Sequence, residues 1–285
     1  MLKILNIIGT SFDSTRGGVV SFLKSYLGYF VEDDEIQYDI VCLSENRDGD
    51  SVKKLQKNAN LYILPEFKLK KIKEIRTQFS HLLDEQEYDV VHLHSANMGF
   101  VFLPIAKRKR VKKIVVHSHN TKLSESKMKC FRNRVLCMHN EKFLTHRCAC
   151  STEAGISMFG KEKFTVIPNA IHSSKFAYNE EKRDEIRKFY GIDSGDFLIG
   201  TIGRLCRQKN QKFLIHVMNE CLKENPNIKL MIVGDGELKD DLMSLAEEMN
   251  LKKNVLLVGH QSNVHEFLSA FDLFVLPYHS LHLEL

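Results

Sequence analysis

Two segments in the C-terminal half decide the fold prediction: Gly203-Arg204-Leu205-Cys206-Arg207-Gln208-Lys209-Asn210 and Val233-Gly234-Asp235-Gly236-Glu237. Each joins a short apolar run to a helical pattern, so each predicts a turn from a strand into a helix. Such a turn exposes backbone N–H groups at the positive end of a helix dipole, which suits a phosphate. The first turn adds the cations of Arg204 and Lys209, and the second adds a carboxylate that can bind sugar hydroxyls. Together they indicate a site for a sugar nucleotide.

The same alternation of strand and helix surrounds both segments. We expect strands at 197–202, 228–233, 254–258 and 272–276, and helices at 210–224, 237–249 and 263–270. Alternation of this kind is typical of parallel βαβ units. A third strand-end loop contains Gly259-His260 and Asn263-Val264. Three such loops in succession predict a ligand-binding edge of the sheet.

The N-terminal half repeats this architecture. Its apolar runs predict strands at 3–8, 38–43, 61–64, 89–94, 113–117, 146–150 and 164–167, with helices near 18–31, 70–86, 97–109, 127–144 and 152–159. The fold class is therefore α/β, with two Rossmann-like parallel-sheet domains. We expect the first domain at 1–171, a polar linker at 172–196 with a short helix over 180–190, and the second domain at 197–285.

Strand-end residues in the first half are further candidates for a site. Gly17-Gly18 precedes the first helix and permits close backbone approach, although the loop lacks the GxGxxG pattern. His92 and His94 end one strand, while His117 and His119 end another, so all four point toward any ligand of this half. Residues two apart share a face, which leaves a metal site open; a histidine that lines a ligand cleft is favoured. The acidic pair in Asp48-Gly49-Asp50 is more typical of a solvated turn than of a metal site.

Composition limits the partners that the protein can have. The net charge of +5 is too small to indicate a nucleic acid. Basic clusters at 68–73 and 107–113 are either solvated helix surfaces or a surface for anionic lipid headgroups. The seven cysteines are odd in number and form no CxxC pair, which fits a reducing cytoplasm better than a disulfide framework or a zinc site. No apolar run approaches the ~20 residues that span a bilayer.

Motifs in both halves of the sequence resemble those of a known family. In the second half the similarity is carried by "GTIGRLCRQKNQKFLI", "LMIVGDGELKDDL", "NVLLVGH" and "FDLFVLP", and in the first half by "RGGVVSFL", "DVVHLHS", "VVHSHN" and "VIPNAI". These motifs resemble the family 4 retaining glycosyltransferases of the GT-B fold (glycosyl transferases group 1). Within that family, the chain is most similar to bacterial enzymes of capsular or exopolysaccharide assembly.

The resemblance implies a reaction and a set of roles. A sugar would pass, with retention at its anomeric carbon, from a nucleotide diphosphate sugar, UDP- or GDP-linked, to a glycan or lipid-linked acceptor. Arg204 and Lys209 would stabilise the diphosphate in place of a metal, so no cofactor is expected, and His119 would lie at the reacting sugar. The substrate-binding residues implied are Gly17, Gly18, Gly203, Gly234, Asp235, Gly236, Glu237 and Val264. The expected location is the cytoplasm or the inner face of the membrane.

Two departures from the family pattern stand out. Ala170 replaces the glycine of a "PNG" turn, which the linker can absorb. After "FVLP" the family continues with a Glu-Gly loop and a helix that returns to the first domain, whereas this chain has "YHSLHLEL", and Glu284 is out of register. We therefore expect an incomplete second domain, truncated at its C-terminal end. The alternative function is an inactive remnant or a nucleotide-binding scaffold.

Overall fold

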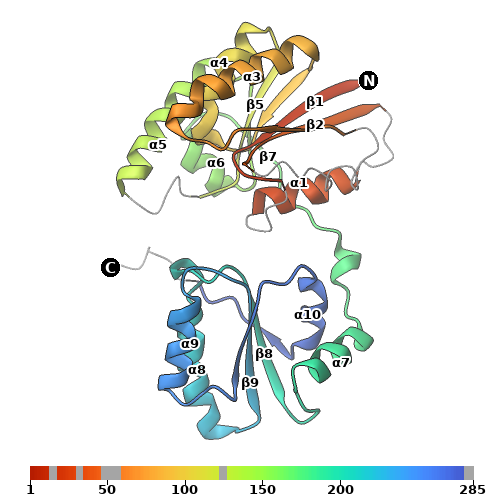
Figure 1. The fold of residues 1–285 in the computed structure, drawn as a ribbon, viewed down its shortest axis with the longest axis vertical. Coiled ribbons are helices and arrows are strands. Elements are labelled where there is room, and N and C mark those ends of the chain that lie inside the picture. Colours follow the sequence, from red (N-terminus) through yellow and green to blue (C-terminus); the bar gives the residue numbers. More distant parts are fainter. Residues whose placement is uncertain (13–17, 30–34, 46–58, 122–126, 279–285) are drawn as a thin grey trace. The chain divides into compact units, whose positions relative to one another are not determined.

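The computed structural model describes residues 1–12, 18–29, 35–45, 59–121 and 127–278. They form two compact units, unit 1 (Met1–Ile171) and unit 2 (His172–Leu285). Each unit is built on a parallel sheet with helices on both faces (Figure 1). The expected α/β class with two parallel-sheet domains is confirmed.

The sheet of unit 1 has seven strands in the order β3-β2-β1-β4-β5-β6-β7, and all neighbouring strands are parallel. The strands are β1 (Leu2–Ile8), β2 (Ile36–Leu43), β3 (Leu61–Leu64), β4 (Val90–Leu93), β5 (Lys113–Ser118), β6 (His146–Ala149) and β7 (Thr165–Val166). The helices are α1 (Gly18–Tyr29), α3 (Ile72–Glu85), α4 (Gly99–Arg108), α5 (Lys127–Asn140) and α6 (Thr152–Phe159). Every strand and helix expected in this half is present; β3 and α6 have the expected bounds, and the ends of the other elements are shifted by a few residues.

Alternation along the strands divides the core of unit 1 between the two faces of its sheet. Leu5 and Ile7 of β1 face the helices α3 and α4, whose buried residues include Phe79 and Phe102. Ile8 belongs to the other core, which is closed by the apolar side of α1. Because successive side chains of a strand point to opposite faces, Asn6 lies on the same face as Ile8. The α1 side of the sheet therefore carries a buried amide in the middle of an apolar strand.

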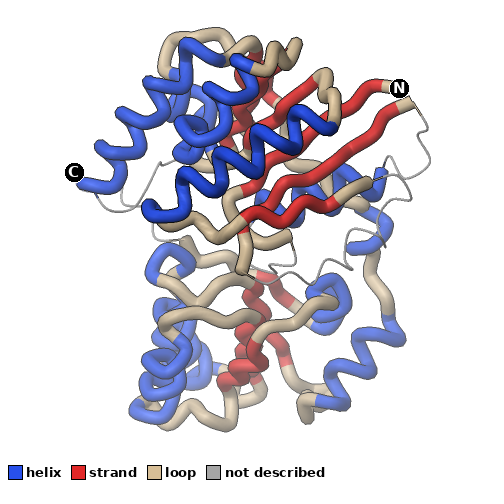
Figure 2. The backbone as a smooth tube through the Cα atoms, turned by 45° about the horizontal axis from the view of Figure 1, so that its top comes forward, coloured by secondary structure: helices blue, strands red, loops and turns tan. Residues whose placement is uncertain are grey.

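The sheet of unit 2 has the order β10-β9-β8-β11 and is also parallel. Its strands are β8 (Phe197–Ile202), β9 (Ile228–Val233), β10 (Val255–Gly259) and β11 (Leu273–Phe274), and its helices are α7 (Glu180–Phe189), α8 (Gln211–Glu224), α9 (Lys239–Glu248) and α10 (Val264–Ala270). One apolar cluster lies under α8 and α9, and a second lies under α7 and α10. Figure 2 shows the strands side by side between these helices.

The strand order reverses once in each sheet, beside the first strand of the unit. In unit 1 the reversal lies between β1 and β4, and in unit 2 between β8 and β11. The loops that leave the two strands at such a point diverge to opposite faces and open a crevice at the carboxyl ends, where open α/β sheets bind ligands.

The segment 172–196, for which we expected a linker, contains α7. The helix begins at an Asn179 cap whose side chain accepts a hydrogen bond from the N–H of Lys182. It packs against α10 and belongs to unit 2. Arg187 holds the helix in place: this buried guanidinium donates to the carbonyls of Asp193 and Ala270 and to the carboxylate of Asp272.

In the part of the chain that the structure describes, no helix is both long and apolar enough to cross a membrane.

Candidate functional site

Three loops meet at the carboxyl edge of the unit 2 sheet. They follow β8, β9 and β10, which are neighbours in the sheet. Backbone hydrogen bonds join them: Leu205 N–H donates to Asp235 (3.0 Å), Leu238 N–H donates back to Leu205 (3.2 Å), and Gly234 N–H donates to Gly259 (2.8 Å). The structure therefore brings together the segments that the sequence placed at one edge.

The close approach of these loops requires glycine at two positions of the second loop. A Cβ on Gly234 would lie 1.9 Å from the carbonyl oxygen of Gly203, and its φ of 147° is one that other residues rarely adopt. A Cβ on Gly236 would lie 2.3 Å from the carbonyl oxygen of Leu205. Because backbone atoms are in the way, neither position can take a side chain without moving a loop. Both glycines thus have a structural role, whatever the loops bind.

The first loop presents two cations, Arg204 and Lys209, and among the described residues only Arg204 forms an ion pair. Arg204 Nη2 donates to Glu237 Oε2 at 2.9 Å, and both side chains are more than half exposed. The backbone N–H of Glu237, and then the guanidinium of Arg204, outweigh desolvation and lower the pKa of the Glu237 carboxyl. Glu237 is therefore an anion that ties the second loop to the first.

Lys209 has no carboxylate partner among the described residues. Its aliphatic stem lies 3.8 Å from the position of a Cβ on Gly203, and its ammonium lies 5.7 Å from the ring centroid of Tyr278, which follows β11. The side chain thus lies across the point where the strand order reverses, between the loops after β8 and β11. An ammonium that is free of carboxylates in this place is available to an anionic ligand.

The remaining residues expected in unit 2 have local partners. Asp235 Oδ1 accepts a hydrogen bond from the N–H of Gly236 at 2.9 Å, so this carboxylate shapes its own turn. Val264 begins α10 and packs against the buried cluster that contains Phe267. Their ligand roles stay predictions.

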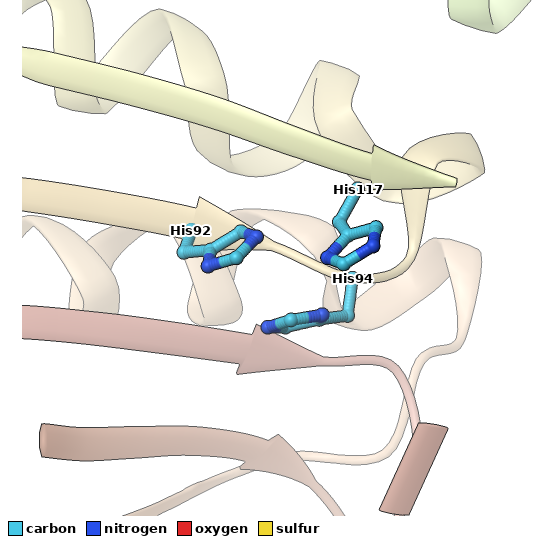
Figure 3. A group of neighbouring side chains, drawn as sticks. All are labelled: His92, His94 and His117. Atoms are coloured by element: carbon cyan, nitrogen blue, oxygen red, sulfur yellow. The ribbon is translucent and has the colours of Figure 1, made fainter. Parts of the chain in front are cut away.

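In unit 1 four histidine rings gather on the α1 side of the sheet. Figure 3 shows His92 and His117 on β4 and β5 and His94 just beyond β4, with their rings close together. His119 follows β5 and stacks on His117 with ring centroids 4.1 Å apart. Phe22 of α1 covers the group, 5.4 Å from the ring centroid of His117. His117 is fully buried within its strand, whereas His119 is only partly buried at the strand end.

Burial keeps these rings neutral. Desolvation, reinforced by neighbouring histidines, lowers the pKa of His92 to about 3 and of His117 to about 2, and it lowers the pKa of His94 well below its usual value. The pKa of His119 falls to about 4, also through desolvation, with Asn169 offsetting part of the shift. At neutral pH, each ring therefore has one N–H donor and one acceptor nitrogen.

One nitrogen from each of His92, His94 and His117 lies within 4.8 Å of the others, as a metal site would require. Zinc–nitrogen bonds of about 2.0–2.1 Å in a tetrahedron place ligand nitrogens roughly 3.4 Å apart. The rings of His92 and His117 are parallel to within 3°, and both nitrogens of His94 are engaged in hydrogen bonds. The described conformation is therefore a stack of rings, which would have to rotate to enclose a metal. Metal independence stays a prediction.

Other expected residues are placed only in part. Gly18 is the first residue of α1, is exposed, and has no atom within 4 Å of the position of a Cβ. Gly17, the segment Asp48-Gly49-Asp50 and Glu284 lie outside the described residues. The sequence interpretation missed Asn6 and Phe22, which contact the histidines. The signal for Asn6 was present, because it is the one uncharged polar residue in the apolar strand Leu2–Ile8.

The fold and the site together define a class of protein: two Rossmann-like units, one with cationic strand-end loops and one with a histidine-lined sheet edge. Models of two families match the chain, glycosyl transferases group 1 over residues 182–284 and glycosyl transferase 4-like over residues 30–146. The chain belongs to these glycosyltransferases, whose structures have the GT-B fold.

Named relatives agree with this assignment. The chain is 31% identical over 225 residues to a UDP-Gal:alpha-D-GlcNAc-diphosphoundecaprenol alpha-1,3-galactosyltransferase of Escherichia coli, a match that covers 72% of this chain and 56% of that protein. It is 26% identical to the putative glycosyltransferase EpsF of Bacillus subtilis, over 92% of this chain and 70% of that one. The structure is similar to that of Anabaena HepE in complex with UDP and glucose, with a TM-score of 0.78, 17% identity, and coverage of 98% of this chain and 74% of that one. The chain thus spans little more than half the length of the Escherichia coli relative.

Proposed function

We propose that the chain transfers a sugar from a UDP-linked donor to a glycan or lipid-linked acceptor, with retention at the anomeric carbon, during assembly of a cell-surface polysaccharide in the cytoplasm. The observation that carries the proposal is the edge of unit 2, where loops joined by backbone hydrogen bonds present Lys209, which has no carboxylate partner among the described residues, at the reversal of strand order. Support for a UDP donor comes from the names of the Escherichia coli relative and of the HepE complex. A GDP-linked donor remains the alternative.

The residues of unit 2 would act on the leaving group. As the bond to the sugar breaks, negative charge grows on the diphosphate, and fixed cations lower the energy of that state. Lys209 supplies a mobile point charge, while Arg204 can form two parallel bonds to phosphate oxygens after it leaves Glu237. Gly203, Gly234 and Gly236 let the backbone approach the phosphates, and Asp235, Glu237 and Val264 lie on the neighbouring loops. The two side-chain cations would take the place of a metal ion.

The residues of unit 1 would act on the sugar and the acceptor. A neutral imidazole can bind a hydroxyl without attracting a second phosphate, so His119 suits the reacting sugar. Gly17 and Gly18 would allow the acceptor or the donor phosphate to approach the start of α1.

The test of this function is the substitution Lys209→Ala. We expect the dissociation constant for UDP to rise roughly 10- to 100-fold, because a charge-assisted bond to phosphate contributes about 1.5–3 kcal/mol. Titration calorimetry with UDP measures the effect. Lys212→Ala is the matched control, since it removes the same charge from an exposed position three residues further along.

The outcomes separate the alternatives. Equal UDP affinity in both variants and in the native chain would contradict the proposed donor site. UDP binding without release of UDP from UDP-sugars, in the presence of lipid-linked acceptors, would favour the nucleotide-binding scaffold over the enzyme.

We also propose that unit 1 contacts anionic membrane through its basic clusters. A cavity of about 760 Å³ lies between α3 and α4, and its lining includes Lys70, Lys73, Arg76 and Arg108 beside the exposed Leu69. Some other members of the clusters are paired with carboxylates, as Lys68 is with Glu45 and Lys109 is with Asp84. Among the described residues, Lys70, Lys73 and Arg108 form no ion pair. A concave surface lined with cations that lack an ion-pair partner favours binding of a lipid phosphate over the alternative of a merely solvated helix surface.

Vesicle binding tests the membrane contact. Replacing Lys70, Lys73 and Arg108 together by glutamine should weaken binding to vesicles that contain phosphatidylglycerol by roughly 100-fold, at about 1 kcal/mol per cation near the surface. The control replaces three exposed lysines elsewhere in unit 1, Lys129, Lys161 and Lys163, by glutamine. The test variant and the control variant therefore have the same net charge. Equal co-sedimentation of the two variants would show that net charge alone drives binding, and the proposal would fail.

A further inference from the structure

The buried polar groups at the strand reversal of unit 1 form a continuous chain of hydrogen bonds. His94 Nε2 lies 3.1 Å from Asn6 Oδ1, and His94 Nδ1 lies 2.9 Å from His119 Nε2. Asn6 is fully buried on β1, and His94 is 5% exposed just after β4. Asn6 and His94 are too deep to meet a substrate, but through these bonds they reach His119 at the surface of the sheet edge.

The orientation of the Asn6 amide is decided by its other neighbour. Its Nδ2 faces the carbonyl oxygen of Asp39 on the adjacent strand β2, at a long 3.5 Å. If the amide were turned over, Oδ1 would face that carbonyl, and two acceptors would oppose each other in a buried place without water. Asn6 therefore presents Oδ1, a pure acceptor, to His94.

The protonation of both histidines then follows step by step. His94 must carry its proton on Nε2 to donate to Asn6 Oδ1. Because the buried ring is neutral, its Nδ1 is an acceptor, and the nitrogen that approaches it, His119 Nε2, must be a donor. His119 is neutral as well, so its second nitrogen, Nδ1, has a free lone pair. Nδ1 is buried and has no partner in hydrogen-bonding geometry among the described residues, although the Asn169 side chain interacts with the ring and raises its pKa.

We infer that Asn6 and His94 are positioning residues, which lock His119 into the tautomer that is protonated at Nε2 and keeps Nδ1 as an acceptor nitrogen for a ligand. This inference rests on the proposed function only for the identity of that ligand. An acceptor nitrogen selects a hydrogen-bond donor, so it fits a sugar hydroxyl and rejects a phosphate or carboxylate oxygen.

Packing supports the same role. His119 is stacked on His117 and lies 5.2 Å from the ring centroid of Phe22, so its ring plane is held from two sides. Rotation of the ring by a half-turn would break the bond to His94 and leave the buried acceptor His94 Nδ1 unpaired, which costs about 1–3 kcal/mol. Plane and tautomer are thus set by different contacts, and only the tautomer depends on Asn6 and His94.

Nitrogen-15 NMR of the native chain tests the inference without any assay of transfer. In protein labelled at histidine, long-range proton–nitrogen correlations distinguish the two neutral tautomers, and the variants His94→Asn and His119→Gln identify the two signals among the 13 histidines. We expect both rings to carry the proton on Nε2 at pH 7. A proton on Nδ1 of either ring, or fast exchange between tautomers, would overturn the inference. Uptake of one equivalent of Zn²⁺ with loss of the hydrogen bond between His94 and His119 would also overturn the inference.

Variants then separate positioning from structural support. His94→Phe keeps a ring but removes the acceptor, and we expect His119 to show both tautomers and kcat/KM to fall about 10-fold, with UDP affinity unchanged. His94→Asn should rescue both readouts, because the amide oxygen of asparagine can take the place of Nδ1. His92→Phe is the matched control: it removes a ring of the same stack that lies outside the hydrogen-bonded chain, so the tautomer of His119 should stay as in the native protein.

Two results would contradict the positioning role: an unchanged His119 tautomer in His94→Phe, or the same loss of kcat/KM in His94→Asn as in His94→Phe. Failure of the proposed function looks different, because a chain that transfers no sugar would still show the locked tautomer.

Discussion

Lowering the pH from 7 to 5 is expected to reduce the free energy of unfolding of unit 1 by about 7 kcal/mol. Four histidines, His92, His94, His117 and His119, stay neutral in the folded chain because burial holds their pKa values well below the usual 6.5. In the unfolded chain they take up protons near that value. Each contributes about 1.4 kcal/mol per pH unit once the unfolded form is protonated and the folded form is not.

The sign follows from where the protons bind. Below pH 6.5 the unfolded chain binds more protons than the folded chain, so stability falls with pH until the folded pKa values, about 3 for His92 and about 2 for His117, are reached. Carboxylates with lowered pKa, such as Asp89 and Asp272, begin to destabilise only below pH 5. The window between pH 7 and 5 therefore reports on the histidines.

Urea denaturation at pH 7, 6 and 5, followed by circular dichroism, measures this change. The loss is comparable to the total stability of many domains, about 5–15 kcal/mol, so unit 1 should be close to unfolding at pH 5. The double variant His92→Phe/His117→Phe keeps aromatic rings in place and should reduce the pH dependence by about half, because His94 and His119 remain. A midpoint in urea that is the same at pH 7 and pH 5 would show that the rings are hydrated and titrate normally.

Arg187→Ala is expected to destabilise unit 2 by about 2–3 kcal/mol, since it removes several hydrogen bonds of a buried guanidinium, each to a carbonyl or a carboxylate. The Arg187 side chain is 7% exposed and lies 3.1 Å from Asp272, whose carboxylate also accepts from the backbone N–H of Leu198 on β8. Asp272 keeps a second cation, Arg183, so its charge stays compensated in the variant. The Arg187 guanidinium also donates to the carbonyl of Asp196. Its loss would remove these bonds where α7 joins the sheet, and α7 should detach first.

Thermal and urea denaturation compare this variant with Lys223→Ala. Lys223 pairs with Glu220 on the exposed side of α8, where both side chains are more than 60% exposed, so the control should cost less than about 1 kcal/mol. Arg187→Lys should fall between the two, because a lysine keeps the charge but cannot reach all the acceptors at once. Equal stability of Arg187→Ala and Lys223→Ala would mean that α7 is not fastened to unit 2 in this way.

Much of the fold could be predicted because apolar runs and helical periodicity are local signals. The runs at 3–8 and 228–233 became β1 and β9, and the apolar face of 210–224 became α8 with a shift of one residue at its start. The end of 172–196 was harder to interpret. Its polar composition indicated a linker, but two of the partners of Arg187, Ala270 and Asp272, lie more than 80 residues away along the chain, so nothing local showed that α7 would pack against α10.

The candidate site divides in the same way. Lys209 and the glycine-rich turn at 233–237 could be located from the sequence, because a change from strand to helix pattern marks a loop at the carboxyl edge. That Gly234 and Gly236 face the backbone of Gly203 and Leu205 could not, since it depends on how two loops cross. In unit 1, a pair of residues two apart such as His117 and His119 was correctly expected to share a face.

By itself the sequence determined the succession of strands and helices along the chain, the strand-end position of the cationic and glycine-rich loops, and the family. These depend on patterns within about 15 residues. Only the tertiary structure decided the states of the side chains in those loops. It paired Arg204 with Glu237, left Lys209 without a carboxylate partner in the described part of the chain, and joined Asn6 to His94 across 88 positions. The physical reason is that pKa, tautomer and availability for a ligand depend on burial and on partners, which strands brought together in a sheet supply from distant parts of the sequence.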